Sequence, residues 1–224
     1  MPLVVLLAGA RETAAAASWL RAAGCRACAL WAQGAVPVAL DIPAVAAMPD
    51  DVAGVVDASH AFDTASRACV TGDMPYARVG RDPWMPQPGD SWTEVDDIDA
   101  AVAALPSGAR VFAATGRASL PSLAAHDGPV FLRQLTRHDQ PTGFDTCTYV
   151  FGTAPFSVAD EVALLQELKI HVVLARNIGG AGSFPKLAAA RELGLPVVLV
   201  RPPALPQGPR LHNLEDVVGW VQSL

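Results

Sequence analysis

Residues 170–203 read IHVVLARNIGGAGSFPKLAAARELGLPVVLVRPP, and this stretch decides the fold. Two short apolar runs rich in β-branched residues, 171–175 and 196–200, flank residues 184–193, where apolar and charged side chains recur at helical spacing. The stretch therefore predicts a strand, a loop, a helix and a second strand. Strands joined by a helix are parallel, and apolar runs on both strands are typical of a sheet covered on both faces.

The loop after the first of these strands, residues 176–183, contains three glycines. In open α/β sheets, ligands lie beyond the carboxyl ends of the strands, where this loop would be. Glycines let backbone amides approach an anion, and a helix N-terminus adds a partial charge of roughly +0.5. We expect Asn177, Gly179, Gly180 and Lys186 to bind a phosphate or carboxylate. The alternative is a glycine-rich turn that serves geometry alone.

The chain has 224 residues, 51% of them hydrophobic, and a net charge of −6. This composition suits one large or two small globular domains and excludes disorder. The acidic balance argues against nucleic acid and anionic membranes as partners. No apolar run reaches the roughly 20 residues that span a bilayer, and the first residues resemble a buried strand rather than a signal peptide. We expect a cytoplasmic protein.

Cys25 and Cys28 have the spacing of a redox motif. They fall on a predicted strand, where positions three apart face opposite sides, and no second cysteine pair completes a zinc site. We predict free or buried thiols and no metal site.

The first predicted strand, 3–7, leads into an alanine-rich helix, 12–23. The loop between them does not have the GxGxxG pattern, so it is weak evidence for a dinucleotide. Gly9, Ala10 and Arg11 still occupy the expected ligand edge of the sheet.

The second strand, 26–31, ends in Gln33 and Gly34, without the acidic residue that binds the ribose of NAD, which favours NADP. Residues 35–51 carry three prolines and predict an irregular connection.

The next strand, 54–60, ends in Ser59 and His60 and precedes a helix, 62–70, and a strand, 74–79. Histidine at a strand's carboxyl end suits proton transfer or ligand hydrogen bonding. The alternative is that His60 only caps the helix.

Residues 81–90 are rich in proline and aperiodic, which predicts a connection between two domains, 1–90 and 91–224. In the second half, a short helix, 98–105, precedes a strand, 110–114.

Thr115, Gly116 and Arg117 close that strand and can clamp a phosphate or carboxylate with charge-assisted bonds. A solvated surface turn is the alternative. The remaining pattern predicts strands at 130–135 and 148–151, a polar loop between them with His138, Asp139 and Asp145, a helix at 158–168 capped by Ser157, and a C-terminal helix at 213–224.

Five segments, taken in order, resemble the precorrin-6A reductase family of cobalamin biosynthesis. VDASHAF (56–62) resembles the family's IDATHPF, WTEVD (92–96) the opening of its second half, FAATGR (112–117) its TTGR, and APFS (154–157) its GPF turn. Residues 177–197 resemble NSGG followed by KLxAARELGxPV. Their order and spacing together are specific.

The resemblance implies two Rossmann-like domains, with mainly parallel sheets flanked by helices, facing across a ligand cleft. It implies an oxidoreductase that uses NADPH to reduce one carbon–carbon double bond of precorrin-6A, giving precorrin-6B. The substrate would be a polycarboxylate tetrapyrrole, and other cobalamin-pathway enzymes are candidate partners. Hydride transfer needs close positioning of the two reactants and delivery of a proton. Glu12, His60 and Asp145 are the candidate proton donors. The candidate cofactor-binding residues are Gly9, Ala10, Arg11, Ser59, Thr115, Gly116, Arg117, Asn177, Gly179, Gly180 and Lys186.

The chain departs from the family pattern at ligand-facing loops. The first loop lacks a glycine and the threonine of GGTxEA, residues 33–51 lack a GGFGG segment, Thr153 replaces an arginine, and Ile178 replaces a serine. Three rival functions follow: a reductase for the cobalt-containing intermediate of the anaerobic route, a non-catalytic tetrapyrrole- or nucleotide-binding paralogue, and a generic NADP oxidoreductase.

Overall fold

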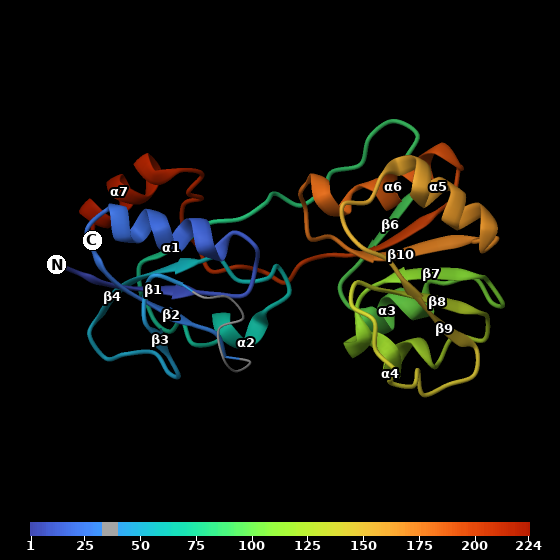
Figure 1. The fold of residues 1–224 in the computed structure, drawn as a ribbon, viewed down its shortest axis with the longest axis horizontal. Helices are drawn as coiled ribbons and strands as arrows, with labels where there is room; N and C mark the ends of the chain where they lie inside the picture. The colour runs from blue at the N-terminus through green and yellow to red at the C-terminus, as the bar shows by residue number, and fades with distance from the viewer. Residues whose placement is uncertain (33–39) are drawn as a thin grey trace. The chain divides into compact units, whose positions relative to one another are not determined.

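The computed structural model describes residues 1–32 and 40–224, which form two compact units (Figure 1). The first unit comprises Met1–Arg81 and Pro203–Leu224, and the second comprises Asp82–Pro202. Each is a parallel sheet flanked by helices, which confirms the predicted fold class. The predicted polar end of the second strand, at Gln33 and Gly34, lies outside the described residues.

The sheet of the first unit has the strand order β3-β2-β1-β4-β5, and every neighbouring pair is parallel. Its strands are β1 (Leu3–Leu7), β2 (Arg26–Leu30), β3 (Ala44–Val45), β4 (Val52–Asp57) and β5 (Tyr76–Arg78). β1 is buried along its whole length because it lies in the middle, between β2 and β4. The chain order reverses between β1 and β4, which makes the edge beyond these two strands the expected ligand position.

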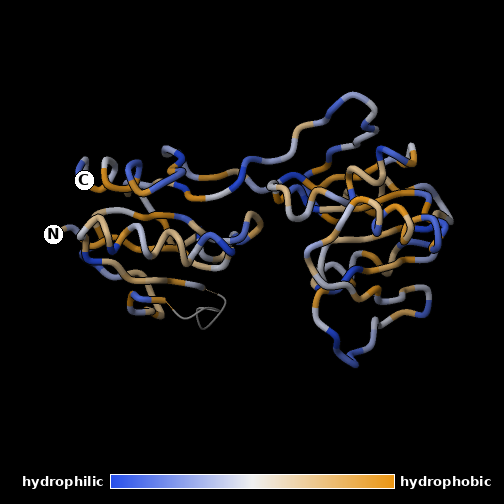
Figure 2. Tube along the Cα trace, turned by 45° about the horizontal axis from the view of Figure 1, so that its top comes forward, coloured by the Kyte–Doolittle hydropathy of each residue, from blue (hydrophilic) through white to orange (hydrophobic). Residues whose placement is uncertain are grey.

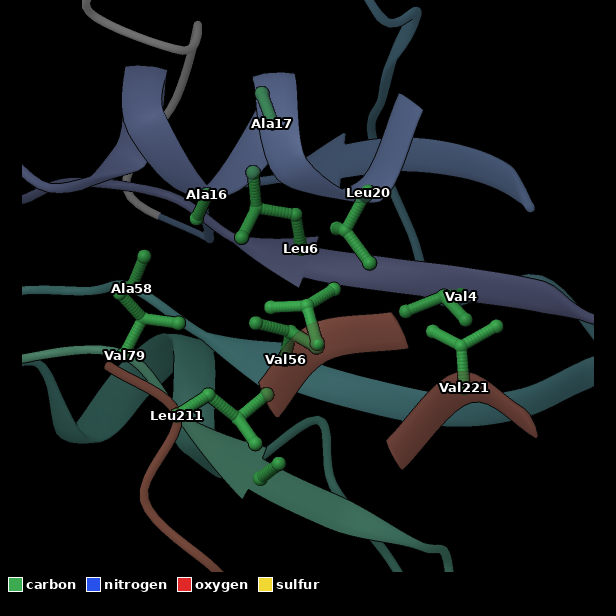
Figure 3. Packing of buried hydrophobic residues seen from close by; sticks show 12 residues of the cluster. Val4, Leu6, Ala16, Ala17, Leu20, Val56, Ala58, Val79, Leu211 and Val221 are labelled. Atoms are coloured by element: carbon green, nitrogen blue, oxygen red, sulfur yellow. The ribbon is translucent and has the colours of Figure 1, made fainter. Parts of the chain in front are cut away.

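Helices α1 (Thr13–Ala22) and α7 (Leu214–Gln222) cover one face of this sheet. Val217 and Val221, one helical turn apart on α7, belong to the same buried cluster as Leu6 and Leu20. Figure 3 shows Val221 in this cluster. The C-terminal helix therefore exists as predicted but packs in the first unit. The compact units thus differ from the predicted domains 1–90 and 91–224, because the apolar side of α7 is buried by α1 and β1.

Helix α2 (Thr64–Arg67) is shorter than the predicted helix 62–70. Asp63 caps it by accepting the Ser66 N–H, so the helix begins later. Its last turn tightens, because the Cys69 N–H bonds the Ser66 carbonyl three residues back.

The sheet of the second unit has the order β6-β11-β10-β7-β8-β9 and is also parallel. Its strands are β6 (Trp92–Val95), β7 (Val111–Ala114), β8 (Val130–Gln134), β9 (Cys147–Phe151), β10 (Val172–Arg176) and β11 (Val197–Val200). β10 and β11 pair in parallel on either side of α6 (Pro185–Glu192) in the chain, so the predicted strand, loop, helix and strand are confirmed. Strand β6 was not predicted. It is a short edge strand with half-exposed or exposed side chains, which weakens its periodic signal.

Helices α5 (Val158–Glu167) and α6 pack together on one face of this sheet, and α3 (Ile98–Ala103) and α4 (Leu120–Leu123) lie on the other (Figure 1). Two short 3₁₀ turns, η1 (Arg117–Ser119) and η2 (Ala181–Ser183), follow β7 and β10. Apolar residues concentrate along the strands of both units (Figure 2). Trp84 is buried in the second core, so the predicted linker 81–90 is anchored to the second unit at this residue, although most of the segment is exposed. Across residues 1–32 and 40–224, no helix has the length and apolar character needed to cross a bilayer.

Candidate functional site

Most of the predicted site residues lie on four loops, two in each unit. In the first unit these loops follow β1 and β4, and in the second they follow β7 and β10. Each pair of strands flanks the point where the chain order of its sheet reverses. Because parallel strands end at the same edge, each unit brings its two loops together at the position where open α/β sheets bind ligands.

The loop after β1 is tied to the loop after β4. The Gly9 N–H donates to Thr13 Oγ1 (3.1 Å), and both Thr13 Oγ1 and the Ala10 N–H donate to the Ala58 carbonyl (3.0 and 3.1 Å). Gly9 has φ +133°, and a Cβ there would lie 3.2 Å from Trp31 Nε1, so glycine is required. The amides of Gly9 and Ala10 are engaged within the protein, so they do not form an open cradle for an anion.

Glu12 lies at the start of α1, where its Oε1 accepts from Arg11 Nε (3.0 Å) and pairs with Arg81 Nε (3.1 Å). Its Oε2 is buried without a hydrogen-bond partner among the residues described. Glu12 thus orients two arginines at the ligand edge of the first unit.

The loop after β4 rests on a buried charged cluster that the sequence analysis missed. Asp57 Oδ2 accepts from Arg67 Nε (2.7 Å) and from the Tyr76 hydroxyl (2.5 Å), while Oδ1 accepts the Ser59 N–H (2.8 Å). Burial alone would raise the pKa of Asp57, but the Arg67 charge and these hydrogen bonds hold it below its ordinary value. Burial and the Asp57 charge raise the pKa of Tyr76.

Arg67 connects this cluster to the predicted site residues. Its Nη2 donates to Ser59 Oγ (3.1 Å) and to the His60 carbonyl (2.8 Å), and Nη1 donates to the Ala61 carbonyl (3.0 Å). Arginine on a helix otherwise rich in small residues, ten positions after a strand-end aspartate, was the signal available in the sequence. The geometry of Ser59 and His60 therefore depends on a buried Asp57–Arg67 pair.

His60 Nδ1 accepts the Phe62 N–H (3.2 Å). The neutral ring consequently carries its proton on Nε2, from which it can donate. The alternative role as a helix cap is wrong, because the N-cap of α2 is Asp63. The imidazole is thus a candidate donor held on a fixed loop.

In the second unit, the loop after β7 has an exposed glycine. Gly116 has φ +79°, and no atom lies within 4 Å of a Cβ built on it. Thr115 Oγ1 and Ser119 Oγ are 2.6 Å apart, and Ser119 Oγ also donates to the Gly116 carbonyl (2.6 Å). Arg117 is half-buried, and its Nε is covered without an acceptor in the part of the chain described. An open glycine beside an incompletely paired guanidinium fits a phosphate or carboxylate.

The loop after β10 differs from the prediction at Asn177. Its side chain is 2% exposed, and Oδ1 accepts the Trp84 N–H (2.7 Å) while Nδ2 donates to the Trp84 carbonyl (3.0 Å). Trp84 Nε1 donates to the Gly180 carbonyl (2.8 Å), and both Gly179 and Gly180 have positive φ. The Asn177 side chain therefore anchors the segment at Trp84 and is almost fully enclosed by the protein.

Lys186, in the first turn of α6, donates to the Ser183 carbonyl and lies 5.5 Å from the centroid of the Trp84 ring. Glu161 on α5 is buried and paired with Arg133 (3.0 Å). Burial lowers the pKa of Lys186 to about 8; the Glu161 charge opposes this shift and the Arg133 charge adds to it. Lys186 thus faces the protein at this position.

Asp145 is not brought to either pair of loops. It is exposed and lies two residues before β9, at the amino end of that strand. β8 and β9 are parallel, so the intervening loop must carry the chain back to the opposite edge of the sheet. Asp145 therefore lies at the edge opposite Thr115 and Asn177.

All four cysteines are free, as predicted. Cys25 lies just before β2, and Cys28 is buried within it.

Known proteins resemble the chain in sequence and in fold. A precorrin-6A reductase from Rhodobacter capsulatus is 40% identical over 179 residues, covering 77% of this chain and 71% of that protein. The precorrin-6A reductases of Rhodococcus erythropolis and Mycobacterium tuberculosis are 34% and 35% identical, covering 73% and 72% of their own lengths and 77% and 76% of this chain. A solved structure, CobK precorrin-6A reductase, matches with a TM-score of 0.78 and 34% identity, over 100% of this chain and 97% of that one.

The family described as precorrin-6x reductase CbiJ/CobK matches residues 44–222. The loops that hold Ser59, Arg117 and Gly180 lie inside this match, and the loop that holds Gly9 lies outside it. Since the match spans most of the chain, the protein belongs to the precorrin-6x reductase CbiJ/CobK family.

Proposed function

We propose that the protein reduces one carbon–carbon double bond of precorrin-6A with NADPH, giving precorrin-6B. The observation that carries this proposal is the 40% identity to a precorrin-6A reductase over 179 residues. The family match over residues 44–222 includes three of the four loops described above, those after β4, β7 and β10.

The loop after β7 supports the binding of a cofactor phosphate. Gly116 leaves open space beside Arg117, whose guanidinium lacks an acceptor at Nε within the described ranges. The backbone of Gly179 and Gly180 and the N-terminus of α6 add dipoles of the sign that stabilises an anion. In this proposal Arg117 and these backbone groups hold phosphate, whereas Asn177 and Lys186 maintain the shape of the loop. NADPH, when bound, would supply the hydride.

The proton is assigned to His60 in this proposal. Its Nδ1 accepts the Phe62 N–H, which leaves Nε2 as the donating nitrogen of a neutral ring. Arg67 fixes the carbonyl of His60 and the hydroxyl of Ser59, so the ring is presented from a rigid loop. Glu12 is the second candidate at the same edge. We do not assign this role to Asp145, because it lies at the amino end of β9.

The carboxylates of the substrate need cationic side chains at the binding site, although the net charge of the protein is −6. Arg11 and Arg81, both held by Glu12, provide such charges beside the loop after β1. Arginine binds carboxylates with two parallel hydrogen bonds, which fixes the orientation of a polycarboxylate ligand.

The test is to mix the purified protein with precorrin-6A and NADPH and to follow the loss of nicotinamide absorbance together with the spectral change of the pigment. We expect both signals to change in proportion. Binding of precorrin-6A without NADPH oxidation would refute the reductase proposal and favour a binding paralogue. A parallel reaction with the cobalt-containing substrate separates the two pathway variants.

His60→Gln tests the assignment of the proton donor, with His212→Gln as the matched control, because His212 is exposed and belongs to the same unit. Loss of a general acid typically slows the chemical step by about 10²- to 10⁴-fold. An unchanged rate in His60→Gln would remove His60 from this role.

A further inference from the structure

Arg78, which the sequence analysis did not single out, is a buried cation with incomplete hydrogen bonding. It is the last residue of β5 and pairs in register with Asp57 of β4, so both lie at the carboxyl edge of the first sheet. Arg78 is 9% exposed. Its Nε and Nη1 are buried and have no hydrogen-bond acceptor among residues 1–32 and 40–224.

Asp57 does not supply the hydrogen-bond acceptor that Arg78 lacks. The nearest approach, from Nη1 to Asp57 Oδ2, is 3.9 Å, which is too long for a hydrogen bond. The same Oδ2 already accepts from Arg67 Nε and the Tyr76 hydroxyl, and Oδ1 accepts the Ser59 N–H. The carboxylate is therefore committed to other donors.

The surroundings of Arg78 also disfavour its positive charge. Burial lowers the pKa of Arg78, the Asp57 charge opposes this, and the charges of Arg67 and Arg210 add to it. The charges of Arg67 and Arg210 therefore add to burial in disfavouring the charged form of Arg78. An arginine stays protonated in proteins, so an anionic oxygen that reaches this edge would supply the acceptor that Arg78 lacks and offset its buried charge.

Gly80 leaves room beside the guanidinium. A Cβ built on this residue would lie 3.2 Å from Arg78 Nε, closer than ordinary van der Waals contact, and Arg210 Nη1 donates to the Gly80 carbonyl (3.1 Å). The absence of a side chain at position 80 therefore lets the guanidinium occupy this place at the edge of the sheet.

We propose that Arg78 donates hydrogen bonds to an anionic oxygen of the bound ligand, supplied by a carboxylate of the precorrin or a phosphate of the nicotinamide cofactor. This inference rests on the proposed function. It adds a specificity-determining residue in the first unit that is independent of the loops after β7 and β10.

The experiment measures the dissociation constants of precorrin-6A and of NADPH separately, for the wild type, Arg78→Gln, Gly80→Ala and Arg21→Gln. Arg21 is the matched control, because it removes the same charge from an exposed ion pair with Asp41 in the same unit. We expect Arg78→Gln to weaken one ligand by about 10- to 100-fold, the range for a charged hydrogen bond, and to leave the other nearly unchanged. The ligand that weakens identifies the source of the anion.

Gly80→Ala displaces the guanidinium without changing its charge, so it should weaken the same ligand to a smaller degree, and it decides the question if Arg78→Gln does not fold. Unchanged affinities for both ligands in a folded Arg78→Gln protein would overturn the inference, as would an equal loss in Arg21→Gln. A wild type that binds neither ligand would instead refute the proposed function, which is a distinguishable result.

Discussion

Replacing Asn177 with alanine tests whether this residue is structural, as its contacts indicate, or a ligand contact. The substitution removes two buried hydrogen bonds to the backbone of Trp84. Each is worth about 0.5–1.5 kcal/mol net, and a buried backbone group left without a partner costs about 1–3 kcal/mol. Water can reach part of the vacated space, so we expect the second unit to lose about 2–4 kcal/mol of unfolding free energy. The bidentate pair between Asp90 and Arg191 should keep residues 82–90 attached.

The assay is urea unfolding combined with hydrogen exchange at the Trp84 amide, which donates to Asn177 Oδ1. A loss of 2–4 kcal/mol corresponds to roughly 30- to 1,000-fold faster exchange at that amide. Asn177→Asp is the matched variant, because it keeps an acceptor for the Trp84 N–H but places an oxygen against the Trp84 carbonyl. It should protect the amide better than alanine does while still lowering stability. The reasoning is refuted if Asn177→Ala changes the unfolding free energy by less than about 1 kcal/mol and weakens NADPH binding instead.

Three further predictions concern residues of the first unit. Asp57→Asn should cost about 3–5 kcal/mol, because Arg67 and Arg78 would remain buried without a counter-charge, and chemical denaturation measures this loss. The folded-state pKa of Asp57 is lowered, so its ionised carboxylate stabilises the fold fully above the unfolded-state pKa, and this stabilisation is lost as pH falls through the folded-state pKa. The free energy of unfolding of the wild type should therefore fall in acid, and that of Asp57→Asn should fall less over the same pH range. Val217→Ala should destabilise the first unit by about 1–3 kcal/mol and leave the second unchanged; a shift in the second unit's transition would contradict the placement of α7.

The elements that the sequence predicts well are those with local and continuous signals. The strand ending at Leu7 and the pair β10 and β11 are runs of buried β-branched and aliphatic residues, and the structure confirms them. Ser157 accepts the Asp160 N–H, as its capping pattern predicts. Strand β6 escaped prediction because it is only four residues long and none of its side chains is fully buried, so Trp92–Val95 carries too few apolar residues to show a period.

What the sequence does not predict is which distant residue completes a contact. The spacing of α7 predicts an amphipathic helix equally well in either domain, and only the shape of the surface beside α1 and β1 selects the first. Asn177 lies in a glycine-rich loop, so the sequence predicts that it contacts a ligand. Its partner in the structure, the backbone of Trp84, lies 93 residues away and leaves no local signal in the sequence. The same applies to Asp145, whose position depends on β8 and β9 being parallel neighbours.

The two units hold the loops at their ligand edges by different kinds of hydrogen bond. In the first unit, a charged pair, Asp57 and Arg67, holds the backbone around Ser59 and His60. In the second, a neutral amide, Asn177, holds Trp84, whose indole in turn bonds the Gly180 carbonyl. A charge-assisted clamp is stronger but depends on the ionisation of its carboxylate, whereas an amide has the same donors and acceptors across the whole pH range. The loop assigned the proton donor is consequently the one whose geometry responds to acid, and the glycine loop assigned to phosphate keeps its shape under the same conditions.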